Sequence, residues 1–107
     1  MSGLQRRVRP EPEHRYVLVP YDKQEAMSVA AAAERVGKSA STLRNWCEQN
    51  AIGRRIGNGH WEVSRIALQM FMDGNTEALG AYHAGNRTDP AVIAYFEKAR
   101  LGRLLDG

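Results

Sequence analysis

The stretch SVAAAAERVGKSASTLRNW, residues 28–46, reads as two short helices joined by a tight turn. Ser28 precedes an alanine-rich run, and a serine in that place accepts hydrogen bonds from the free amides of a first helical turn. The pattern therefore predicts a helix over 29–36, which ends at Gly37.

A second helix follows, for which Ser39 or Ser41 supplies the N-cap. Leu43, Trp46 and Cys47 fall at i, i+3 and i+4, so we expect them to share the face that packs on the first helix. The remaining side chains of this helix form a polar, partly cationic surface: Ser41, Arg44, Asn45 and Glu48. Together, the two segments predict a helix-turn-helix.

The segment 53–63 contains two short alternating runs around a Gly-Asn-Gly tip, which predicts a β-hairpin, or wing. Ser64 can cap a third helix that ends near Gly74 and whose apolar side centres on Ile66 and Met70. We therefore expect a mainly α fold in which three helices and a small β-hairpin wing share one core.

The outer segments carry weaker patterns. Residues 1–26 are expected to be a flexible basic arm, with Tyr16 to Val19 as an edge strand or an extended segment on the core. Residues 27–74 would form the winged helix-turn-helix. Residues 75–107 would form C-terminal helices, first over about 76–84 and then from about 90 to 105. The apolar residues of the last helix cover a wide arc, which indicates an oligomerisation or partner-binding surface. Its candidate contacts are Val92, Ile93, Phe96, Leu101, Leu104 and Leu105.

The composition limits the classes of function. The 107 residues fit one small domain, and 15 basic against 12 acidic residues give a net charge of +3. The excess lies in residues 27–72, with six basic and three acidic side chains, which favours an anionic partner. No apolar run suits a membrane span or a signal peptide, so we expect a cytoplasmic protein with no membrane partner.

No residues suggest catalysis or a cofactor. Cys47 is the only cysteine, and the three histidines lack metal-ligand spacing. There is no glycine-rich phosphate loop and no adjacent nucleophile and base. We therefore expect neither enzyme activity nor a bound metal or cofactor.

The stretch from Met27 to Met72 resembles the excisionase-like and MerR-like winged helix-turn-helix domains. The resemblance is carried by SVAAAAERVG, SASTLRNW and RRIGNGHWEVSRIALQMF, which correspond to the first helix, the second helix, and the wing with the third helix. It implies a second helix that lies in the major groove of double-stranded DNA and a wing that approaches phosphates or the minor groove. Lys38, in a position that is usually apolar, and Trp46, in a position that is usually aliphatic, depart from the family pattern.

The resemblance assigns DNA contacts residue by residue. The second helix and its turn would supply Lys38, Ser39, Ala40, Ser41, Arg44 and Asn45. The wing would supply Arg54, Arg55, Asn58 and His60. Arg44 is the preferred single contact, because a guanidinium binds guanine through two hydrogen bonds or holds a phosphate, while Asn45 can pair with adenine. The N-terminal arm is either a further minor-groove contact or a solubilising tail, through Arg6, Arg7 and Arg9.

Three functions remain open. The first is a small transcription regulator or excisionase-type recombination factor, acting as an oligomer and, for excision, beside an integrase. The second is the small subunit of a phage-type terminase, because Asn45 and Trp46 resemble an Asn-Trp pair of lambda-type small subunits, which recruit a large subunit. The third is a protein-protein adaptor that does not bind DNA.

Overall fold

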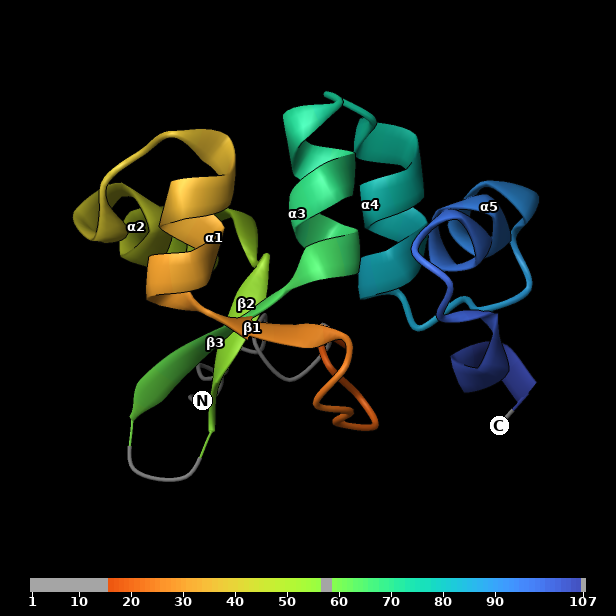
Figure 1. Ribbon diagram of the computed structural model, residues 1–107. Helices are drawn as coiled ribbons and strands as arrows, with labels where there is room; N and C mark the ends of the chain where they lie inside the picture. The colour runs from red at the N-terminus through yellow and green to blue at the C-terminus, as the bar shows by residue number, and fades with distance from the viewer. Residues whose placement is uncertain (1–15, 57–58, 107) are drawn as a thin grey trace, which may run out of the picture.

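The computed structural model describes residues 16–56 and 59–106 of the chain. This part is mainly helical, with a small antiparallel sheet (Figure 1). The helices are α1 (Val29–Val36), α2 (Ala40–Asn50), α3 (Arg65–Met72), α4 (Thr76–His83) and α5 (Pro90–Lys98), followed by the 3-10 helix η3 (Gly102–Asp106). The strands are β1 (Ala26–Ser28), β2 (Gly53–Ile56) and β3 (His60–Ser64).

The helices begin where the sequence places their caps. Ser28 accepts a hydrogen bond from the amide of Ala31, and Gly37 ends α1 in the left-handed conformation with φ 71°. Ser39, rather than Ser41, caps α2. Ser64 likewise caps α3, so the predicted starts of three consecutive helices are confirmed.

The sheet has the order β1-β3-β2, with both neighbouring pairs antiparallel. The predicted hairpin is confirmed in its strands, with Gly53 opposite Val63 and Arg55 opposite Trp61. Gly57 and Asn58 at its tip lie outside the described residues. β1 is an addition to the expected fold, because it pairs on the other side of β3.

The strand considered for Tyr16 to Val19 is not formed. These residues form turns and bends, and Leu18 has a positive φ of 56°, which is incompatible with a strand. The side chains of Val17 and Leu18 are nevertheless buried in the core. The segment therefore lies on the core, as the alternative prediction held, but it is not extended as that prediction also held.

α1 and α2 occupy one end of the molecule, and α5 lies at the other end beyond the neighbouring pair α3 and α4 (Figure 1). Leu43 and Cys47 of α2 are buried, as predicted. Trp46 is half-buried and reaches α3, where its ring centroid lies 4.9 Å from that of Phe71. The apolar face of α2 thus packs on more than the first helix.

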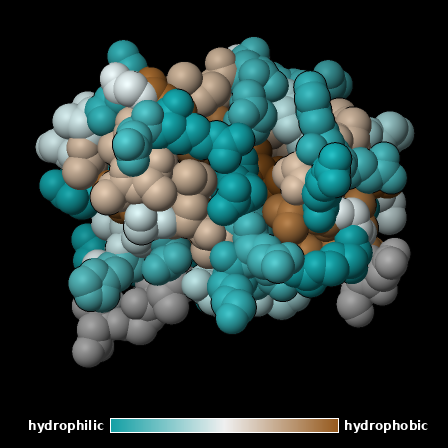
Figure 2. Space-filling view, viewed as in Figure 1, coloured by the Kyte–Doolittle hydropathy of each residue, from teal (hydrophilic) through white to brown (hydrophobic). Residues whose placement is uncertain are grey.

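One hydrophobic core spans both the predicted helix-turn-helix segment and the C-terminal helices. The surface in the view of Figure 1 is largely hydrophilic, and hydrophobic residues show between the hydrophilic ones (Figure 2). Within the described part of the chain, no helix combines the length and apolar character needed to cross a bilayer.

The last helix is shorter than predicted. α5 ends at Lys98, and Arg100 then adopts a positive φ of 64° before η3 begins. Val92, Phe96 and Leu101 are buried inside this chain, so their assignment as contacts to a second chain is wrong: their apolar surface already covers α3 and α4. Three half-buried residues remain predicted contacts: Ile93, Leu104 and Leu105.

A buried polar cluster joins distant segments of the fold. Glu25 is 4% exposed, and its Oε2 accepts hydrogen bonds from Ser64 Oγ at 2.6 Å and from the Tyr82 hydroxyl. The Tyr82 oxygen also accepts a hydrogen bond from the Leu18 amide at 3.1 Å. These four residues connect the N-terminal segment, the start of α3 and α4.

Candidate nucleic-acid interface

The face of α2 that is turned away from the core is polar and exposed. Ser41, Arg44, Asn45 and Glu48 are all exposed, whereas Leu43 and Cys47 on the other face are 0% and 2% exposed. The 3.6-residue period of the helix produces this division. The structure therefore gathers the predicted contacts of α2 on one accessible surface.

The turn before α2 extends this surface. Lys38 and Ser39 are exposed, and Ala40 is half-buried. The Ser39 hydroxyl is already engaged, because it accepts a hydrogen bond from the Thr42 amide at 3.1 Å. It also lies 3.0 Å from the hydroxyl oxygen of Thr42. The Lys38 side chain has no such partner among the described residues. The capping role of Ser39, in contrast, limits the use of the Ser39 hydroxyl as a ligand contact.

The cations of this surface carry no internal ion pair within the described residues. Only Arg103 and Asp22 form a salt bridge in that part of the chain, at 3.2 Å. Lys38 and Arg44 are consequently not neutralised by a described carboxylate within 4 Å. Such cations keep their full charge available to an external anion.

Arg54 and Arg55, which the sequence groups together in the predicted wing, lie on opposite faces of the hairpin. Successive residues of a strand point to opposite faces, so Arg55 shares a face with Gly53, and Arg54 lies on the other one. A Cβ built on Gly53 would lie 2.8 Å from Cys47 Sγ, which shows that α2 covers the face of Arg55. Arg54 stands opposite Glu62 in the register.

Arg55 is held in place by the hairpin itself. Its guanidinium carbon lies 5.0 Å from the centre of the Trp61 ring, and Nη1 donates a hydrogen bond to the Gly59 carbonyl at 3.3 Å. Trp61 is half-buried against the core, so it forms a firm support for the arginine. The cross-strand pairing of Arg55 with Trp61 could have been read from the hairpin register, but not from the motif.

The other predicted contacts are less well placed. His60 is exposed at the start of β3. Asn58 and the three arm arginines Arg6, Arg7 and Arg9 lie outside the described residues. Among the residues that are described, no group of three or more His, Cys, Asp or Glu side chains could hold a metal ion.

Cys47 belongs to the packing of α2 rather than to its polar surface. It is 2% exposed, and burial raises the pKa of its thiol to about 11. A thiol with such a pKa is almost entirely protonated at neutral pH and is a poor nucleophile. Its position next to Gly53 lets α2 approach the hairpin closely.

The geometry thus presents one exposed helix face and one supported wing arginine on the side of the sheet that α2 covers. Comparisons with known proteins add no assignment to it: no family model matches the chain, and no curated protein or solved structure was found to be similar to it.

Proposed function

We propose that this protein binds double-stranded DNA, with α2 in the major groove and Arg55 on the phosphate backbone. The observations that carry the proposal are the exposed Arg44–Asn45 pair on α2 and an exposed hairpin arginine, Arg55, on the side of the sheet that α2 covers. An α-helix fits the width of the major groove, and arginine and asparagine make the bidentate contacts that distinguish bases there.

The roles of the side chains follow from their positions. Arg44 and Asn45 would read base edges, and Lys38 would neutralise a phosphate at the entry to the helix. Arg55, aligned by Trp61, would contact the backbone beside the groove. Arg54 points to the other face of the hairpin and has a smaller part in this arrangement.

A single α2 covers few base pairs, so useful affinity requires several copies on neighbouring sites. This suits a small transcription regulator or an excisionase-type recombination factor. The half-buried apolar residues after α5, Leu104 and Leu105, are candidate contacts between copies.

The first test is selection of bound fragments from a random DNA duplex library by the purified full chain, at low and at near-physiological salt. A motif repeated at fixed spacing supports a regulator or excision factor and gives the distance between half-sites. Salt-sensitive recovery without a motif favours the packaging role of a small terminase subunit. Failure to recover DNA at either salt contradicts the proposal and favours an adaptor.

Variants then test the side chains on the selected DNA by fluorescence anisotropy. Arg44→Gln should weaken binding by about 5- to 150-fold, and by less on DNA that lacks the contacted base pair. Arg55→Gln should reduce the slope of affinity against salt by about one phosphate contact, and Arg54→Gln should change it less. Arg100→Gln, on the exposed residue after α5, is the charge-matched control.

A further inference from the structure

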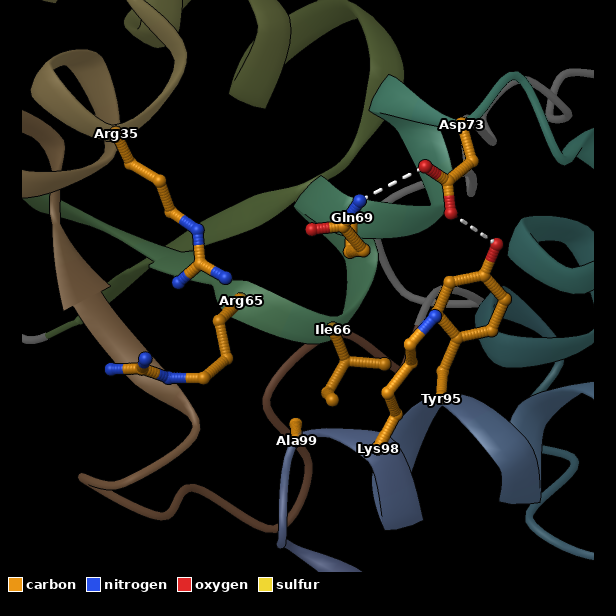
Figure 3. A pocket seen from close by; sticks show the side chains of 8 residues that line it. All are labelled: Arg35, Arg65, Ile66, Gln69, Asp73, Tyr95, Lys98 and Ala99. Atoms are coloured by element: carbon orange, nitrogen blue, oxygen red, sulfur yellow. Dashed lines mark hydrogen bonds between the residues drawn. The ribbon is translucent and has the colours of Figure 1, made fainter.

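A cavity of about 270 Å³ is lined by residues that belong to α1, α3 and α5 or directly follow α3 and α5, and by none of α2. We call it the α1–α3–α5 cavity. Its lining residues are Arg35, Arg65, Ile66, Gln69, Asp73, Tyr95, Lys98 and Ala99. Figure 3 shows Arg35 and Arg65 at one end, Asp73 and Tyr95 at the other, and Ile66 and Ala99 between them.

The described residues that line the cavity carry an excess of positive charge. Arg35, Arg65 and Lys98 face a single carboxylate, that of Asp73. None of the three cations forms a salt bridge with a carboxylate of residues 16–56 or 59–105. Three cations from three different helices thus line one space that holds one carboxylate, and none of the three is engaged in a salt bridge with a described carboxylate.

Asp73, the one carboxylate among the lining residues, already accepts hydrogen bonds from neighbouring side chains. Asp73 accepts hydrogen bonds from the Tyr95 hydroxyl at 2.7 Å and from Gln69 Nε2 at 2.9 Å (Figure 3). These bonds, with the positive charge of Lys98, hold the pKa of Asp73 below its ordinary value. Asp73 is therefore ionised at neutral pH, and its remaining lone pairs can accept a hydrogen bond from a ligand hydroxyl.

Arg65 is the least exposed of the three cations that line the cavity. Its Nε is buried and has no hydrogen-bond partner within the described part of the chain. The buried Nε does not open on the cavity, but the Arg65 side chain lines the cavity together with Arg35, so an acceptor placed there would lie near two cationic side chains.

We propose that the α1–α3–α5 cavity binds a small organic oxyanion that also carries hydroxyl groups. The carboxylate or phosphate of the ligand lies against Arg35 and Arg65, its carbon atoms lie on Ile66 and Ala99, and a hydroxyl donates to Asp73. The volume accommodates such a molecule, since it is several times the roughly 30 Å³ share of one water molecule in the liquid. This site is separate from the proposed DNA contacts, and its test uses no motif or DNA sequence.

The test is isothermal titration of the full chain with glycerol phosphate, glycerate and inorganic phosphate. At least one of the two organic anions should saturate with a Kd of about 1 mM or lower, and it should bind more tightly than inorganic phosphate. Preference for glycerol phosphate or for glycerate identifies the oxyanion as a phosphate or a carboxylate. Absence of saturation by both organic anions at about 50 mM overturns the proposal.

Variants locate the binding. Arg35→Gln, on an exposed residue, and Lys98→Gln should each weaken binding about tenfold. Arg65→Lys keeps the charge but removes the planar guanidinium, so it should also weaken binding, with circular dichroism as the check on folding. Arg44→Gln, on α2, should leave binding unchanged, and an equal loss with that variant would show nonspecific charge attraction and overturn the site.

Binding of duplex DNA by the same variants distinguishes the small-ligand site from a role of these cations in DNA binding. If Arg35→Gln and Lys98→Gln weaken the binding of duplex DNA while the organic anions do not bind, the cavity cations serve the DNA backbone, and the small-ligand site is refuted. Failure of the proposed DNA binding would leave the titration result untouched, so the two proposals fail separately.

Discussion

Tyr82 donates its hydroxyl hydrogen to Glu25 although 57 positions separate the two residues, and both side chains are buried. Among the described residues, no cation pairs with this carboxylate within 4 Å, so its interactions are hydrogen bonds. Removal of one hydrogen-bond donor from such a buried carboxylate is therefore expected to lower the free energy of unfolding.

Tyr82→Phe should lower the free energy of unfolding by about 1–3 kcal/mol, because it removes one donor to Glu25 and the acceptor of the Leu18 amide. Urea unfolding measures the change. Tyr21→Phe removes an exposed hydroxyl whose hydrogen bond to Glu62 is long, at 3.5 Å, so this variant should have little effect on the free energy of unfolding. Equal losses for the two variants would show that the buried cluster does not stabilise the fold.

Gly53 and Gly80 should respond in opposite ways to alanine. A Cβ at Gly53 would lie 2.3 Å from the Glu62 carbonyl oxygen and 2.8 Å from Cys47 Sγ, so Gly53→Ala must push β3 and α2 away. We expect a loss of about 1–3 kcal/mol or more. Gly80 lies within α4 with nothing within 4 Å of such a Cβ, and Gly80→Ala should stabilise by up to about 1 kcal/mol. Thermal unfolding of both variants checks the contrast, which a loss for Gly80→Ala would contradict.

Cys47 should make the fold less stable in alkaline solution. Burial raises the pKa of its thiol from 9.0 to about 11, so between these values the unfolded chain releases the proton and the folded chain keeps it. The free energy of unfolding therefore falls as pH rises through this window, by up to about 2 kcal/mol.

The measurement is urea unfolding at several pH values from 8 to 11 for the native chain and for Cys47→Ala. The variant removes the contribution of the thiol, so its stability should depend less steeply on pH. This holds even if the smaller alanine side chain lowers the stability at neutral pH. Identical pH dependence in the two proteins would argue against a buried, protonated thiol.

Local signals predicted the helical part of the fold well. Ser28, Ser39 and Ser64 each begin a helix through a hydrogen bond that spans only three positions, and such contacts depend on nearby residues alone. The exposed face of α2 follows from the same kind of local periodicity.

The errors arise from contacts between distant residues. β1 consists of Ala-Met-Ser, which has no strand pattern of its own and becomes a strand by pairing with β3. The apolar residues of α5 indicated a second chain, but the same pattern arises when a helix covers α3 and α4 of its own chain. Arg35, Arg65 and Lys98 share no sequence motif, and only the folded chain brings them to the lining of one cavity.

The shared hydrogen bonds of Glu25 also order the events of synthesis. Because its partners are Ser64 and Tyr82, a nascent chain that ends between them can form α1 and α2 but leaves this carboxylate without its full set of donors. The N-terminal half therefore reaches its final packing only after α4 has left the ribosome. The buried cluster that ties Glu25 to the rest of the fold is thus completed only when Tyr82 of α4 can reach this carboxylate.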